Sequence, residues 1–443
     1  MKPGVYNIIS AATEISCNIL AQDGVIINKG SFTLKAPSTY IKNIIFNNTQ
    51  GITSNFYLSN ITNCKFVNVS KSNLDLIDSK IYSKNQGIYN LTVEDSTFQD
   101  FYKSYGSKRN MHRYIWDNIS FIHCNFRYVI GNENTIDNSY FTNFTFNHTV
   151  FNSLLSGSNN PEKVNVYFKD VFVFNSTVRQ LFDAGNYDPG KRVAYYVDNF
   201  TVINSTTVAP NTYGLFITGR SSIISNVIVN NLITTVNTAI IYTDAANNRV
   251  KLYNLTVSNF NTTSGVIRND YYNVFVDTFV LNNVSASRAI IHNKGDSKFY
   301  RLNFNNVTFD SVAVLLDNDE VFNSTFIDFK GNLKIMGDTI KNSETNFINS
   351  KNNTMGNGTC IELIRGEYLF IDGCTFINNT GYNGGAVYIH NITDSSYILN
   401  SVFSGNTASN LGGAVYVEPG IYYFISQSTR NTINTTFLGH AFI

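Results

Sequence analysis

Short segments in which apolar and polar residues alternate recur along this chain. Residues 40–46 read Tyr-Ile-Lys-Asn-Ile-Ile-Phe, and residues 226–230 read Asn-Val-Ile-Val-Asn. Alternation over four to six residues predicts strands with one buried face. Asn, Gly, Ser and Asp separate these segments, and those residues favour turns. No segment shows helical periodicity, so the pattern predicts an all-β protein.

A second pattern repeats at longer range. A small or polar residue is followed by any residue, by an aromatic or β-branched residue, and soon by Asn or Asp, as in Cys64–Asn68 and Cys374–Asn378. The apolar marker returns at intervals of about 17 to 32 residues, and such a period predicts a solenoid. The markers are Phe46, Phe66, Phe98, Phe126, Val150, Val173, Val202, Ile228, Val257, Phe279, Phe309, Phe326, Phe347, Phe376 and Phe403.

Short strands separated by turns, at about 25 residues per circuit, predict a parallel β-helix in which each strand pairs with its equivalent one coil away. The chain holds about 65 asparagines, far above ordinary usage. Stacked asparagines at turns form amide ladders and tolerate left-handed backbone. Small residues two positions before the marker are expected to share one inward slot. They are Cys64, Ser96, Cys124, Cys374 and Ser401.

Charge and composition narrow the class of protein. Lys and Arg number 32 and Asp and Glu 31, which argues against a nucleic-acid partner held by a basic field. No apolar run is long enough for a transmembrane helix, and the amino terminus has no signal core. Five scattered cysteines predict neither a disulfide scaffold nor a zinc site.

The carboxy-terminal part carries a more specific motif. Phe376-Ile377-Asn378-Asn379 is followed by Gly384-Gly385-Ala386-Val387, and the same pattern returns as Phe403-Ser404-Gly405-Asn406 and Gly412-Gly413-Ala414-Val415. This FxxN and GGA[ILV] pair resembles the repeat of chlamydial polymorphic outer-membrane proteins. It also resembles the adhesin-like β-helix repeat proteins of gut methanogenic archaea, to which the asparagine-rich, cysteine-poor composition points.

The resemblance implies a single-stranded, right-handed parallel β-helix of the pectate-lyase-like kind, exposed at a cell surface. Residues 1–40 are expected to form an amino-terminal capping coil, and 41–443 the repeats, clearest at 374–417. The chain ends in mid-pattern, as a truncated coding sequence would. We expect Gly384, Gly385, Gly412 and Gly413 to shape the coil, because glycine permits tight turns and close backbone approach.

Candidate binding residues lie in two long intervals between markers. The first is basic and aromatic and contains Tyr105, Lys108 and Arg109; the second is turn-rich and contains Tyr187 and Arg192. Loops over a rigid scaffold often bind ligands, and these side chains suit sugar recognition. We therefore expect an extracellular, adhesin-like protein that binds glycans or surface proteins of host or neighbouring cells, without nucleic acid or membrane span.

The search for catalytic chemistry predicts no catalytic residue, no metal site and no cofactor. The six histidines form no HxH or HExxH motif. Ile115-Trp116-Asp117-Asn118 is faintly similar to a segment of pectate lyases but lacks its histidine, so Trp116 is expected to pack or to lie on the surface. Two alternatives stay open: a polysaccharide lyase or glycoside hydrolase on this scaffold, and a structural envelope or stalk segment.

Overall fold

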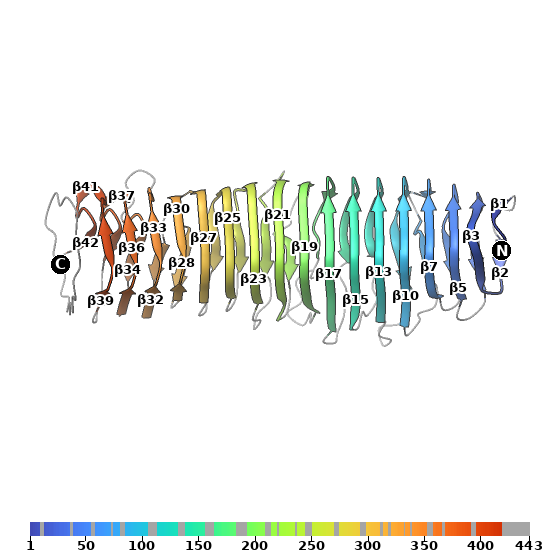
Figure 1. Ribbon diagram of the computed structural model, residues 1–443, viewed down its shortest axis with the longest axis horizontal. Helices are drawn as coiled ribbons and strands as arrows, with labels where there is room; N and C mark the ends of the chain where they lie inside the picture. Colours follow the sequence, from blue (N-terminus) through green and yellow to red (C-terminus); the bar gives the residue numbers. More distant parts are fainter. Residues whose placement is uncertain are drawn as a thin grey trace. The chain divides into compact units, whose positions relative to one another are not determined.

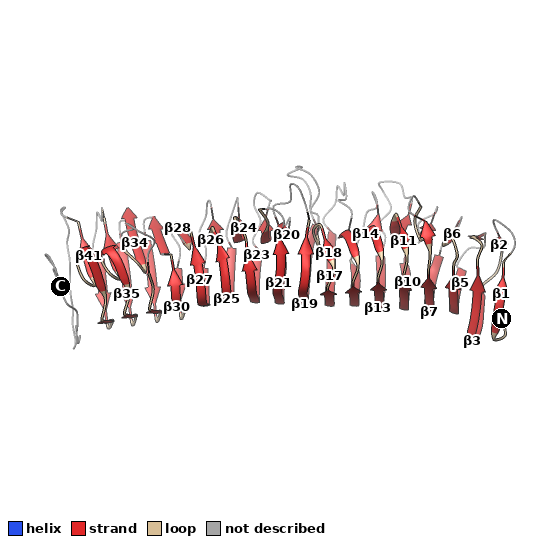
Figure 2. Ribbon diagram, turned by 90° about the horizontal axis from the view of Figure 1, so that it is seen from above, coloured by secondary structure: helices blue, strands red, loops and turns tan. Residues whose placement is uncertain are grey.

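The fold was analysed in a computed structural model. It describes residues 1–8, 13–35, 39–54, 58–71, 74–79, 85–104, 113–131, 138–155, 164–182, 193–208, 214–218, 221–234, 237–243, 250–269, 274–292, 298–310, 313–317, 320–331, 333–336, 339–351, 358–365, 368–390 and 396–418. These residues form strands and turns without a helix (Figure 2). The chain folds as two compact units, 1–236 and 237–443.

The first unit is a parallel β-solenoid in which each main strand pairs with the main strand of the next coil (Figure 1). The main strands are β1 (Gly4–Asn7), β3 (Ile19–Asn28), β5 (Thr39–Asn47), β7 (Leu58–Val67), β10 (Asn85–Glu94), β13 (Arg113–Ile122), β15 (Ser139–Asn147), β17 (Val164–Phe174), β19 (Val193–Thr207) and β21 (Ile223–Thr234). Shorter strands complete the coils: β2 (Thr13–Ile15), β4 (Phe32–Leu34), β6 (Ile52–Ser54), β8 (Ser70–Lys71), β9 (Ile77–Ser79), β11 (Thr97–Phe98), β12 (Asp100–Ser104), β14 (Asn125–Gly131), β16 (Val150–Leu155), β18 (Thr177–Val178) and β20 (Gly214–Thr218).

The second unit repeats the same architecture. Its main series is β23 (Val250–Asn261), β25 (Val274–Ala286), β27 (Lys298–Phe309), β29 (Glu320–Phe322), β30 (Thr325–Lys330), β32 (Thr339–Ser343), β33 (Asn346–Ile348), β35 (Tyr368–Asp372), β36 (Thr375–Ile377), β39 (Ser396–Leu399) and β40 (Val402–Ser404). A second sheet contains β22 (Ala239–Thr243), β24 (Gly265–Asn269), β26 (Arg288–His292), β28 (Val314–Asp317), β31 (Leu333–Met336), β34 (Ile361–Arg365), β38 (Val387–Ile389) and β42 (Val415–Val417). Strands β37 (Thr380–Asn383) and β41 (Thr407–Leu411) form a two-stranded sheet.

The all-β parallel β-helix expected from the alternation is therefore confirmed, in both units. Inward residues stack along each core, as Phe326, Phe347, Phe376 and Phe403 do with ring centroids 4.7–5.2 Å apart. Such stacks contribute beyond simple burial because aromatic pairs favour offset-stacked geometry. The capping role of residues 1–40 stays a prediction.

Two left-handed bends recur along the series of main strands: the first lies within a main strand or between a main pair, and the second lies within the strand or directly after it. In the first unit the first bend holds Asn43, Asn63, Asn90, Asn118, Asn143, Asp170, Asn199 and Asn226, all with positive φ. The second bend holds Lys29, Asn48, Asn68, Asp95, His123, His148, Asn175, Asn204 and Asn231. Amides of neighbouring coils bond one another at both bends: Asn118 Nδ2 donates to Asn90 Oδ1 at 2.8 Å, and Asn231 Nδ2 to Asn204 Oδ1 at 2.9 Å.

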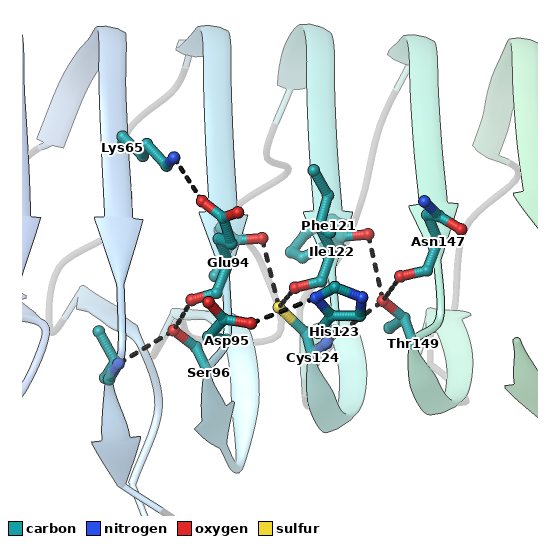
Figure 3. Close-up of polar contacts among 12 residues, drawn as sticks. Lys65, Glu94, Asp95, Ser96, Phe121, Ile122, His123, Cys124, Asn147 and Thr149 are labelled. Carbon is teal, nitrogen blue, oxygen red and sulfur yellow. Dashed lines mark hydrogen bonds and ion pairs between the residues drawn. The ribbon is translucent and has the colours of Figure 1, made fainter.

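The expectation of one shared slot for small residues is wrong. Ser96 and Cys124 follow the second bend (Figure 3), whereas Cys64 follows the first bend and pairs in register with Leu91. Cys374 and Ser401 also follow a first bend, that of the second unit. The residue after either bend points inward. The pattern of a small residue two positions before an apolar marker therefore occurs at two different places in the coil.

Small polar residues directly after the bends have a common role. In Figure 3, Ser96 Oγ donates to the Glu94 carbonyl at 2.7 Å and accepts from the Val69 amide at 3.0 Å. Thr149 Oγ1 accepts from the Cys124 amide in the same way, at 3.4 Å. Small polar side chains thereby satisfy backbone groups that the bend leaves without strand partners. All five cysteines are free thiols.

Candidate functional site

Three tyrosines form a row on the outer surface of the first unit. Tyr140, Tyr167 and Tyr196 are register neighbours on β15, β17 and β19, strands that lie side by side in Figure 1. Their rings stack with centroids 4.6 and 4.7 Å apart and interplanar angles of 5° and 16°. Tyr140 is 37 % exposed. We call these three residues the tyrosine row.

The surroundings of the row are partly apolar and partly cationic. Ile223 on β21 follows Tyr196 in register and is 36 % exposed. At the other end, the Arg113 guanidinium lies over the Tyr140 ring, 5.6 Å from its centroid. This contact is a cation–π interaction, in which the ring face attracts the positive charge.

The stacking decides which parts of the row a ligand can reach. Both faces of Tyr167 are covered by its neighbours, so its accessible parts are the ring edge and the hydroxyl. Burial raises the pKa of Tyr167, and the hydroxyls of Tyr140 and Tyr196 add to this shift. The Tyr167 phenol therefore stays neutral, and each hydroxyl of the row can both donate and accept hydrogen bonds. A line of such groups matches a ligand with repeated hydroxyls.

A second cluster brings two buried carboxylates together with two cations: Asp75 lies just before β9, Asp100 and Lys103 lie on β12, and Arg127 lies on β14. Asp75 and Asp100 are 6 % and 1 % exposed. Lys103 Nζ lies 3.7 Å from Asp75 Oδ2, and an Arg127 amino nitrogen lies 3.3 Å from Asp100 Oδ2. Burial raises the pKa of Asp75 to about 6, helped by the Asp100 carboxylate and opposed by Lys103. Burial also raises the pKa of Asp100, against Arg127 and Lys103.

This cluster makes stability depend on pH. Because the folded pKa of Asp75 lies above its unfolded value, its contribution is fully present below pH 4 and lost as pH rises through about 6. Asp75→Asn removes this titration. As pH rises from 4 to 7.5, the unfolding free energy of wild type should fall by about 2–3 kcal/mol relative to that of the variant. Urea unfolding of both proteins across this range measures the difference, and a constant difference would contradict the assignment.

The binding residues expected from the sequence lie elsewhere. Tyr105, Lys108, Arg109, Tyr187 and Arg192 fall outside the described residues, so their role stays a prediction. Trp116 is fully buried in the core, against Phe101, Tyr102 and Phe141. Asp117 faces outward, where its Oδ1 accepts from Thr142 Oγ1 at 2.6 Å and from Asn143 Nδ2 at 2.8 Å.

The glycines of the GGA motifs have the geometry of tight turns. Gly384 and Gly412 adopt φ of 65° and 64°. A Cβ on Gly385 would overlap the carbonyl oxygens of Gly413 and Thr407, the latter at 2.6 Å. Ala386 is fully buried and donates its amide to the Ala414 carbonyl at 2.8 Å. Coil-to-coil contact at this corner is thus made through backbone.

Sequence reasoning missed the tyrosine row, although a signal for it exists. Each of its tyrosines stands three residues before the first-bend residue of its own coil: Asn143, Asp170 or Asn199. Equal phase relative to the bends places side chains in one column. The apolar markers do not reveal this column, because some of them follow the first bend and others follow the second bend.

Comparisons with known proteins identify one repeat near the carboxy terminus, and they do not assign the whole chain to a family. Residues 400–418 match the Chlamydia polymorphic membrane protein repeat. A metabotropic glutamate receptor-like protein P of Dictyostelium discoideum is 29 % identical over 136 residues. That match covers 30 % of this chain, and the chain spans about a tenth of the relative's length. The described residues contain no helix long and apolar enough to cross a membrane.

Two solved structures resemble the chain weakly. The PL6 family alginate lyase AlyGC has 8 % identity and a TM-score of 0.27, with 98 % of this chain and 96 % of that chain covered. PfbA, a surface adhesin of Streptococcus pneumoniae, has 10 % identity and a TM-score of 0.21, with 88 % and 86 % covered. Scores of this size carry no argument about function.

Proposed function

We propose that this protein is a non-catalytic, adhesin-like surface protein that binds glycans along the tyrosine row. The observation that carries the proposal is the stacking of Tyr140, Tyr167 and Tyr196 at 4.6–4.7 Å on an outer sheet face. Parallel strands repeat at about 4.8 Å, so the hydroxyls recur at a fixed interval. A glycan chain, which repeats its own hydroxyls, is the ligand that such a line recognises best.

The likeness to the chlamydial repeat at residues 400–418 supports placement at a cell surface. The ligand would then be a glycan, or a glycosylated surface protein, of a host or neighbouring cell. We retain the relationship to adhesin-like proteins of methanogenic archaea as part of this proposal. We also propose, from the sequence, that Tyr105, Arg109 and Tyr187 contribute to binding.

The test compares the wild-type chain with Tyr140→Phe/Tyr167→Phe/Tyr196→Phe on a glycan array and then by calorimetry. This triple variant keeps the stacked rings and removes the hydroxyls. Each lost hydrogen bond costs about 0.5–1.5 kcal/mol, so we expect binding to weaken at least ~10-fold. Tyr105→Ala, Arg109→Ala and Tyr187→Ala test the contribution of these three residues separately.

The matched control is Tyr253→Phe/Tyr300→Phe in the second unit. Both residues are partly exposed on outward positions and contact Phe275, with ring centroids 5.5 Å apart in each pair. This variant should bind like wild type. Absence of glycan binding by wild type, or equal binding by the tyrosine-row variant, would overturn the proposal.

A polysaccharide-cleaving activity is the second candidate, favoured by the cluster of Asp75, Asp100, Lys103 and Arg127. Paired carboxylates with perturbed pKa values are typical of catalytic acids and bases. Every bound polysaccharide should therefore be assayed for new reducing or unsaturated ends. Cleavage that Asp100→Asn abolishes would favour the enzyme over the adhesin.

A further inference from the structure

Three successive coils of the first unit break the asparagine ladder at the second bend. Asparagine occupies this position at Asn48 and Asn68 before the break and at Asn175, Asn204 and Asn231 after it. The coils between them carry Asp95, His123 and His148, with φ of 49°, 51° and 49°. The backbone is therefore unchanged, while the side chains switch from amides to metal-ligating groups.

The three side chains lie close together and are accessible. Asp95 Oδ1 lies 3.2 Å from His123 Nδ1, and the side chains are 56 % and 57 % exposed. The His123 and His148 rings have centroids 5.3 Å apart. Figure 3 shows one nitrogen of His123 directed at Asp95 and the other directed toward the next coil, which carries Asn147 and Thr149. His148 stands between those two residues in the sequence.

This arrangement has the chemistry of a metal ligand with its supporting carboxylate. Metal-binding histidines usually donate their second ring N–H to a carboxylate, which fixes the tautomer and the ring orientation. Here Asp95 occupies the supporting position at Nδ1, and it leaves Nε2 of His123 available. Imidazole nitrogens suit zinc, copper and nickel.

We propose that His123 and His148 chelate one divalent transition-metal ion, with Asp95 as a positioning residue behind His123. No three such groups are already gathered around one point in the part of the chain that is described. The ion is therefore held by the two imidazoles, with water completing its coordination, after a side-chain rotation of His148. The site is independent of the tyrosine row.

The experiment titrates ZnCl₂ and NiCl₂ into the full chain by calorimetry in a chelator-free buffer at pH 7.5. The variants His123→Asn and His148→Asn restore the residue found in neighbouring coils, so the fold should be preserved. We expect one ion per chain for wild type and at least ~100-fold weaker binding for each histidine variant. Loss of the supporting carboxylate typically costs 10–100-fold, so Asp95→Asn should fall in that range.

His390→Asn is the matched control, because His390 also pairs with a carboxylate, that of Glu418, but has no second histidine beside it among the described residues. It should bind zinc like wild type. A second readout is the dependence of binding on pH: affinity should fall in acid, because imidazole binds a metal ion only in its neutral form. Absence of binding by wild type, or unchanged binding by His148→Asn, would overturn the proposal.

Discussion

Replacing Gly385 by alanine should open the carboxy-terminal coils of the second unit. A Cβ at this position overlaps two backbone oxygens, those of Gly413 and Thr407. Backbone on both sides is fixed, because the Gly385 amide lies 3.1 Å from the carbonyl oxygens of Gly412 and Gly413. The clash cannot be relieved by a rotamer change, so we expect a loss of about 3–5 kcal/mol.

Hydrogen exchange measured by mass spectrometry locates this effect. Amides of 374–418 should lose protection, while those of 1–236 should keep it. The matched control is Gly373→Asn. Gly373 has φ of 62°, its Cβ would meet Glu344 only at 3.8 Å, and Asn400 occupies the same bend one coil later. This control should change stability by no more than about 0.5 kcal/mol. Equal behaviour of the two variants would refute the steric argument.

The fold could be predicted because its physical causes are local and repeated. Alternation such as that of residues 40–46 requires one buried face, and β5 has that pattern in the structure. The asparagine excess follows from bends that demand positive φ, which asparagine tolerates better than most residues. Both signals recur in most of the described coils, so misreading one copy does not change the prediction.

The same geometry explains why N-x-[ST] triplets are frequent. Asn118 stands at the bend, Ile119 points inward and is fully buried, and Ser120 points outward. Asn378, Asn379 and Thr380 repeat this order at bend, core and surface. The shape of the coil therefore favours the triplet, because it places asparagine at the bend, any inward residue next, and a hydroxyl residue on the outer surface after that.

The candidate sites could not be predicted in the same way, because they depend on register between coils. Tyr140 and Tyr167 meet only if the number of residues between their bends is known. Marker spacing varies along the sequence from about 17 to 32 residues, so it does not give this number. His123 and His148 show the same difficulty: they form no local motif, and one coil separates them in sequence while 5.3 Å separates their rings.

Replacing Asn379 by leucine should be among the most destabilising substitutions in the protein. Asn379 is fully buried, one residue after a second bend. Its Oδ1 accepts from the Ser350 amide at 2.9 Å, and its Nδ2 donates to the Phe347 carbonyl at 3.2 Å and to Asn406 Oδ1 at 2.8 Å. Leucine has a similar volume but leaves a buried N–H and a buried carbonyl unpaired, at about 1–3 kcal/mol each. We expect a loss of about 3–5 kcal/mol.

A double-mutant cycle with Asn406→Leu separates this network from simple packing. Asn406 Oδ1 receives both the side-chain and the backbone N–H of Asn379, and its Nδ2 donates to the Phe376 carbonyl at 2.9 Å. The two substitutions should therefore be non-additive by at least ~1 kcal/mol in urea unfolding. Asn378→Ala at the exposed bend is the control and should cost only about 1 kcal/mol, the strain of positive φ. Additive losses would mean that the asparagine of the FxxN motif fills space, whereas coupling would mean that it binds one coil to the next.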